Sequence, residues 1–248
     1  MLYKFVFPRS AHIFVQSQQM LADVHHYGIP KNKMTAVPMG VDTEISHSSN
    51  IQPIDDIRLK DKRVIVYLGT LDRARSIEVL FEMLVILKAK IPNLLLILVG
   101  DTEDSDHAAW LKLEAVRLGV IDSVLWTGWL PMEEGWRYVC AAELGLSPFP
   151  RSFLLDSASP TKAVEYMAIG LPVVVNDNPD QALIIQESQA GLCVKFGAAS
   201  FAEAVITLLN DPQLRNEMAI KGKQYVASHR GYDSLSQLVA STYKHILR

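Results

Sequence analysis

Short apolar runs alternate along this chain with longer amphipathic segments, and this alternation restricts the fold more than any other feature. The strand-like runs are His12–Val15, Val64–Leu68, Leu94–Val99, Val124–Thr127, Leu144–Ser147, Val173–Asn176 and Cys193–Lys195. The helix-like segments are Gln18–Tyr27, Ile77–Lys90, Ala108–Leu118, Glu133–Ala141, Thr161–Ile169, Asp180–Gln186, Ser200–Asn210, Pro212–Ser228 and Tyr232–Leu247. Strands and helices that alternate in this way form a parallel sheet with helices on both faces. The sequence therefore predicts an α/β protein with a doubly wound parallel sheet.

The composition of the 248 residues limits the classes of protein that the chain can represent. Hydrophobic residues make up 49%, enough for a sizeable core, which argues against a disordered chain. A net charge of −3 gives no reason to expect a nucleic-acid partner. Cys140 and Cys193 each lie in an apolar run, so we expect small buried residues and not a disulfide. Two such cysteines fit a reducing, cytoplasmic setting.

We expect neither a membrane-spanning helix nor a cleaved leader. A spanning helix needs about 20 predominantly apolar residues. The longest apolar segment, Ile77–Ile91, is interrupted by glutamates and lysines. The first residues lack the apolar length of a signal peptide.

A polar stretch divides the chain into two unequal parts. Residues 46–61 have no strong period and are predicted to form a linker. Residues 1–45 contain one strand–helix unit, which is typical of the tail of a preceding domain. The complete α/β domain is predicted to occupy residues 62–248.

The run Ser159–Val175 is the most informative motif. Ser159 is a good helix cap and Pro160 suits the first helical position, while Gly170 suits the residue after the last turn. A buried strand then follows. Lys162 and Glu165 are three residues apart at the N-terminal end of this predicted helix, where free N–H groups attract anions. The motif predicts a binding site for a diphosphate and a sugar hydroxyl.

Ligands of open α/β sheets bind beyond the carboxyl ends of the strands. Four cations follow two of the predicted strands, Val64–Leu68 and Leu144–Ser147, and are expected to converge at this edge, although each alone is typical of a solvated surface charge. They are Arg73, Arg75, Arg151 and Lys162. Together they indicate an anion site. The acidic run 101–106 lacks the ligand spacing of a calcium loop and is expected to be solvated.

Several common motifs of α/β enzymes are missing from the sequence. There is no Gly-x-Gly-x-x-Gly fingerprint, no Walker sequence and no Gly-x-Ser-x-Gly elbow. These absences argue against a nicotinamide dehydrogenase, a P-loop enzyme and an α/β-hydrolase. The seven histidines show no metal-ligand spacing, so no metal is expected.

The loops at the strand ends resemble those of retaining glycosyltransferases of family 4, which have the GT-B fold of two facing Rossmann-like domains. Residues 67–76 resemble the family's glycine-turn segment, with Arg75 at the position of a diphosphate-binding lysine. Gly128-Trp129-Leu130 resembles the loop that holds the base. Residues 165–174 match the most specific signature, in which Glu165 is the second acid of Glu-x7-Glu and binds ribose. The chain differs at the first acid, where Ser157 stands beside Asp156; that acid normally contacts the donor sugar. Thr70 and Ser76 replace a common Arg and Gly.

The resemblance implies a set of functional residues. Arg75 and Lys162 would be catalytic, stabilising charge on the departing diphosphate. The substrate-binding residues would be Gly69, Thr70, Arg73, Gly128, Trp129, Leu130, Ser157, Ala158, Ser159, Pro160, Thr161 and Glu165. Fixed cations and a helix terminus do the work of a metal, so no cofactor is implied beyond the nucleotide-diphosphate sugar donor.

The resemblance also covers the start of the chain. Residues 11–17 resemble the last strand of an N-terminal acceptor domain, and residues 38–42 resemble the hinge between domains. The chain would therefore carry mainly the donor-binding half, would be inactive alone, and would lack most of the domain that takes a glycan, lipid or small-molecule acceptor. Two alternatives stay open: a nucleotide-sugar binding module and a GT-B sugar-nucleotide epimerase. For the full-length protein, the resemblance allows peripheral association with the inner face of a membrane.

Overall fold

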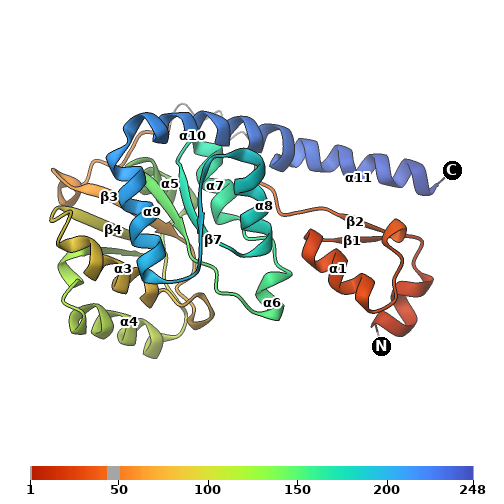
Figure 1. Cartoon of the computed structure of the whole chain (residues 1–248), viewed down its shortest axis with the longest axis horizontal. Coiled ribbons are helices and arrows are strands. Elements are labelled where there is room, and N and C mark those ends of the chain that lie inside the picture. Colours follow the sequence, from red (N-terminus) through yellow and green to blue (C-terminus); the bar gives the residue numbers. More distant parts are fainter. Residues whose placement is uncertain (1, 44–50, 248) are drawn as a thin grey trace.

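A parallel sheet of six strands forms the centre of the protein (Figure 1). The computed structural model describes residues 2–43 and 51–247. Across the sheet the order is β5-β4-β3-β6-β7-β8, and every neighbouring pair is parallel. The strands are β3 (Arg63–Leu68), β4 (Leu94–Val99), β5 (Val124–Gly128), β6 (Leu144–Ser147), β7 (Val173–Asn176) and β8 (Gly191–Val194). The predicted doubly wound α/β fold is confirmed.

Helices cover both faces of this sheet, and two hydrophobic cores result. One face carries α3 (Glu78–Lys88), α4 (Ser105–Arg117) and α9 (Ala198–Asn210); the other carries α5 (Met132–Cys140), α7 (Lys162–Ile169) and α8 (Pro179–Ser188). Helix α10 (Pro212–Tyr225) contacts both α7 and α9. Successive residues of β3 alternate between the cores, with Ile65 and Tyr67 in one and Val64 and Val66 in the other. Strands buried on both faces require such continuous apolar runs.

The strand order reverses between β3 and β6, and this reversal positions the site. From β3 the chain adds β4 and β5 on one side, then returns to place β6, β7 and β8 on the other. The connections leave β3 and β6 in opposite directions, so a crevice opens beyond the carboxyl ends of these two strands. Residues 69–77 and 148–161 follow β3 and β6 and lie beside that crevice.

A smaller unit lies beside the sheet domain. Strands β1 (Ile13–Val15) and β2 (Met34–Ala36) pair in parallel, and helix α1 (Gln18–His26) packs against both strands. The sequence predicted β1 and α1 but not β2, which is only three residues long. Of the predicted linker, residues 46–50 lie outside the described residues, and Ile57–Leu59 form one short 3-10 turn. The predicted domain boundaries stay predictions.

The C-terminal helix joins the two units. Val41 forms a parallel bridge with Gly231, just before α11 (Tyr232–Ile246) begins. In Figure 1, α11 extends from the sheet domain over β1 and β2. The rings of Phe14 and Tyr243 lie 5.6 Å apart at this contact.

Two local predictions are wrong. Strand β8 begins at Gly191, two residues before the predicted start, because the ladder with β7 already pairs Gly191 with Val173. Cys193 is exposed and Cys140 is half-buried, so neither is the fully buried residue expected; both are free thiols. In the described parts of the chain, no helix has the length and apolar character needed to cross a membrane.

Candidate functional site

A pocket of about 290 Å³ opens beyond the carboxyl ends of β3 and β4 and reaches the start of α7. Seven predicted site residues line it, namely Gly69, Thr70, Trp129, Leu130, Thr161, Lys162 and Glu165. Six further lining residues were not predicted, namely Leu68, Val99, Gly100, Pro131, Met132 and Gly135. The pocket is therefore shared between the loops after β3, β4 and β5 and the first turn of α7.

The C-terminal end of helix α7 agrees with the prediction, whereas its N-terminal end does not. Gly170 ends the helix in the left-handed conformation (φ 81°), as predicted. The predicted cap is wrong, because the helix begins at Lys162 and Ser159 lies too far upstream. The Ser159 hydroxyl instead donates to Asp180 Oδ2 at 2.7 Å and accepts from the backbone N–H of Met39 at 3.0 Å. Pro160 therefore lies before the helix and not at its first position.

Lys162 lies at the floor of the pocket. A Cβ added to Gly69 would lie 2.5 Å from Lys162 Cε and 2.8 Å from Lys162 Nζ. The lysine side chain therefore packs against the backbone of Gly69, where no larger residue would leave it room. Its Nζ also lies 5.4 Å from the centre of the Tyr67 ring. Burial, together with the neighbouring Arg75 guanidinium, lowers the pKa of Lys162 to about 8. Lys162 forms no ion pair with any described residue.

Arg75 is the second cation of this cluster, although it does not line the pocket itself. It ends the short 3-10 turn Arg73–Arg75, which Ser76 closes in the left-handed conformation (φ 49°). Its guanidinium lies over the Phe149 ring, 4.6 Å from the centroid. The buried Nε and Nη1 have no hydrogen-bond partner among the residues described. Arg75 is therefore held by an aromatic face and carries two buried donors whose hydrogen bonds are not made by the described residues.

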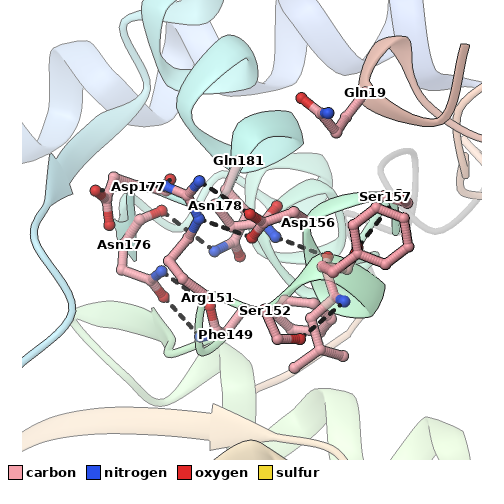
Figure 2. Close-up of polar contacts among 12 residues, drawn as sticks. Gln19, Phe149, Arg151, Ser152, Asp156, Ser157, Asn176, Asp177, Asn178 and Gln181 are labelled. Carbon is pink, nitrogen blue, oxygen red and sulfur yellow. Dashed lines mark hydrogen bonds and ion pairs between the residues drawn. The ribbon is translucent and has the colours of Figure 1, made fainter. Parts of the chain in front are cut away.

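The other two predicted cations each have a carboxylate partner, and neither lines the pocket. Arg73 Nε donates to Asp104 Oδ2 at 2.9 Å, and both side chains are exposed. Arg151 donates twice to Asp156, at 2.7 and 2.9 Å, and once to the carbonyl of Asp177 (Figure 2). Nearby carboxylates hold both guanidinium groups, which the sequence pattern could not reveal.

Glu165 lies on the pocket wall one turn beyond Lys162. Burial raises its pKa, while the Thr161 hydroxyl and the Lys162 charge act in the opposite direction. The two side chains influence each other electrostatically but form no ion pair within the described structure. Glu165 is thus available as a hydrogen-bond acceptor for a hydroxyl in the pocket.

Ser157 occupies a contact between the two units of the molecule. Its hydroxyl donates to Asp23 Oδ2 in α1, and its carbonyl accepts from the Ser17 hydroxyl at 2.7 Å. Ala158 follows it without lining the pocket. A carboxylate is thus present beside Ser157, but it comes from Asp23. The neighbouring Asp156 has both of its carboxylate oxygens bound to Arg151.

The opposite wall of the pocket is more apolar and more open. Trp129 and Met132 expose 57% and 62% of their surface, so an aromatic or apolar ligand group could be covered there. Gly128 lines an adjoining cavity of about 150 Å³, with Asp101 and Lys112. Gly135 was missed, although a glycine inside a predicted helix often indicates a close approach. Met132 was missed because α5 begins one residue before its predicted start.

The acidic run 101–106 has structural partners. Asp104 caps α4 by accepting from the His107 N–H at 2.9 Å, and Asp101 accepts from the N–H of Thr102. Among the described residues, no group of three or more His, Cys, Asp or Glu side chains could hold a metal ion.

Comparison with known protein families shows the family to which this chain belongs. The family model of the group 1 glycosyl transferases matches residues 52–225, which include every residue of the pocket. The chain belongs to this family. The chain is 25% identical to EpsD of Bacillus subtilis (strain 168) over 194 residues, which are 75% of this chain and 48% of EpsD. It also matches LpsE of Rhizobium meliloti (strain 1021), a lipopolysaccharide core biosynthesis glycosyltransferase, with 25% identity over 73% of this chain and 51% of LpsE.

Solved structures show the same fold. HepE of Anabaena, crystallised in complex with UDP, has a TM-score of 0.79 at 17% identity, covering 96% of this chain and 65% of HepE. The fold is thus that of GT-B glycosyltransferases. The group 1 chain described here spans about half the length of the curated relatives it matches.

Proposed function

We propose that this glycosyltransferase chain binds a nucleotide-diphosphate sugar and, with the remainder of the protein, transfers the sugar to an acceptor hydroxyl with retention of configuration. The observation that carries the proposal is the pair of cations Arg75 and Lys162, which lie at the strand-order reversal and form no ion pair with a carboxylate of residues 2–43 or 51–247. Two unneutralised cations near a pocket favour a ligand that supplies negative charge.

Each wall of the pocket has a role in this proposal. Lys162 and Arg75 stabilise the charge that develops on the departing diphosphate. Glu165 accepts hydrogen bonds from the ribose hydroxyls, and the base lies against Trp129 and Leu130. The acceptor hydroxyl attacks from the face that the diphosphate leaves, which retains the configuration. Fixed cations perform this work without a metal cofactor. The UDP bound to HepE supports a uridine nucleotide as the first donor to test.

Calorimetric titration with UDP, GDP, ADP, CDP and dTDP tests the proposal. We expect one diphosphate to bind and both Arg75→Ala and Lys162→Ala to weaken it by about 10- to 100-fold, since each removes a charge-assisted contact. Arg117→Ala and Lys88→Ala remove exposed charges far from the pocket and serve as matched controls. Absence of binding to every diphosphate would sink the proposal.

A binding module that transfers nothing by itself is the second candidate. The coverage of only about half of EpsD and LpsE favours it. Donor hydrolysis or transfer by the 248-residue chain would exclude this candidate, whereas diphosphate binding without turnover would support it.

A further inference from the structure

Asn176, the last residue of β7, makes an unusual contact with the loop that follows β6. Its Oδ1 accepts from the backbone N–H of Phe149 at 2.6 Å, and its Nδ2 donates to the carbonyl of the same residue at 2.9 Å (Figure 2). The side chain is fully buried. The ladder between β6 and β7 ends at the pair Ser147 and Val175, so the Phe149 peptide groups have left the sheet. The carboxamide of Asn176 takes the place of the missing strand partner.

Other buried amides surround this contact. Gln181 accepts from the Ser147 hydroxyl at 2.5 Å and donates to the Ser147 carbonyl at 3.2 Å. Asn178 donates to the carbonyl of Leu155, further along the same loop, at 2.9 Å. Buried polar networks of this kind hold a single arrangement of the backbone. Figure 2 shows these side chains gathered beside the loop that leads to Ser157.

Phe149 connects this network to the site. Its ring is buried and lies under the Arg75 guanidinium, 4.6 Å from the centroid. Among the described residues, Arg75 forms no ion pair, and its Nε and Nη1 have no hydrogen-bond partner. The ring is thus the contact that orients the guanidinium, and the Asn176 amide fixes the backbone that carries the ring.

We propose that Asn176 is a positioning residue that sets the place of Arg75 through the ring of Phe149, and thereby the share of donor affinity that comes from the diphosphate. The inference rests on the proposed function, because it takes Arg75 as a diphosphate ligand. It predicts an effect on the diphosphate and none on the nucleoside, which contacts other walls of the pocket.

The measured quantity is the Kd of the nucleoside divided by the Kd of its diphosphate. Uridine and UDP are the first pair to test. If another diphosphate of the panel binds in place of UDP, that diphosphate and its nucleoside are used. We expect Asn176→Ala and Phe149→Leu each to lower this ratio by about tenfold, since a desolvated cation–π contact loses its geometry. Phe149→Leu keeps the backbone contact with Asn176 and an apolar side chain, so it guards against a folding defect in Asn176→Ala.

Asn178→Ala is the matched control. It removes the same kind of bond to the same loop, but at Leu155 and away from Arg75. We expect its ratio to equal that of the wild type. An unchanged ratio in folded Asn176→Ala or Phe149→Leu would overturn the inference, as would an equal loss in Asn178→Ala.

Asn176→Asp gives a second, independent readout. A protonated carboxyl can donate to the Phe149 carbonyl and accept from its N–H, as the amide does, whereas a carboxylate can only accept. Burial raises the pKa of such a group. Relative to the wild type at the same pH, the ratio in this variant should recover as the pH falls; the absence of recovery contradicts the inference. A wild-type ratio near one would mean that the diphosphate adds no affinity. That result would overturn the proposed function, and the inference that rests on it.

Discussion

The ammonium of Lys162 lies between the Tyr67 ring and the bare backbone of Gly69, and burial and the Arg75 charge lower its pKa to about 8. A charged group in such a place destabilises the empty site and prepares it for an anion. The same residue therefore controls how both ligand binding and stability respond to pH.

Diphosphate affinity should fall as the pH rises through about 8, because Lys162 is charged below that pH and neutral above it. Calorimetric titrations of a nucleoside diphosphate between about pH 6.5 and 9.5, which extend about 1.5 pH units to either side of the pKa of Lys162, measure how the affinity changes with pH. Lys162→Met is the control and should bind weakly without that slope. An equal slope in this variant would assign the pH dependence to another group.

Stability should respond to the same residue with the opposite sign. The folded-state pKa of about 8 lies below the ordinary value of 10.5, so between these values the unfolded chain binds more protons and stability rises with pH. Lys162→Met should therefore stabilise the ligand-free chain at neutral pH by about 3 kcal/mol and remove the rise. Urea unfolding measures both effects, with the exposed Lys88→Met as control. A destabilised Lys162→Met chain would show that the charge is favourable where it lies.

At the scale of elements, the helix α7 depends on its contact with strand β6. Tyr166 is fully buried, and its hydroxyl accepts from the N–H of Leu68 at 2.7 Å. A Cβ on Gly145 would collide with the Tyr166 ring, because the ring packs directly on the strand backbone. The glycine of β6 thus sets how closely α7, and with it Lys162, approaches the sheet.

Gly145→Ala should destabilise the chain by about 1–3 kcal/mol, the usual cost of overpacking a core. Denaturant unfolding measures this loss. Gly135→Ala is the control, since its added methyl group meets Val99 at 3.4 Å and replaces glycine inside a helix. The Gly135→Ala chain should be at least as stable as the wild type. Equal destabilisation by the two substitutions would argue against the Tyr166 contact.

Local patterns predicted the elements well and their partners less well. The helix–Gly170–strand sequence of α7 and β7 was predicted because glycine and β-branched residues act within a few positions. The Ser159 cap was wrong because Asp180 and Arg230, far along the chain, bind that hydroxyl. The partners of Arg73 and Arg151 were likewise not visible from local patterns. Phe149 and Asn176 gave no local signal, since their contact exists only once β6 and β7 are paired.

At the scale of the whole molecule, a buried ion pair connects the segment at Met39 to the loop before α7. Arg230 Nη2 donates to Asp180 Oδ1 at 2.8 Å, and both side chains are at least 96% buried. Arg230 Nη1 also reaches the Ser159 hydroxyl and the Met39 carbonyl, each at 3.3 Å. Four distant segments thus meet at one guanidinium.

Arg230→Met should destabilise the chain by about 3–5 kcal/mol, because it leaves the Asp180 carboxylate buried without a partner. Adding Asp180→Leu should restore much of the loss. Urea unfolding of the single and double variants measures both. Arg117→Met, which removes an exposed pair screened by solvent, should leave the free energy of unfolding almost unchanged. A small loss in Arg230→Met would mean that water reaches Asp180.

The bridge between Val41 and Gly231 has a mechanical consequence. The chain crosses between the β1–α1–β2 unit and the sheet domain at these two places, and hydrogen bonds of 2.9 and 3.1 Å fasten the two crossings side by side. A narrow ribbon of two strands bends readily across its flat face but resists bending in its plane. Any bending of the two units across this ribbon would also have to break the hydrogen bonds of Ser157 with Asp23 and Ser17, which join the same two units.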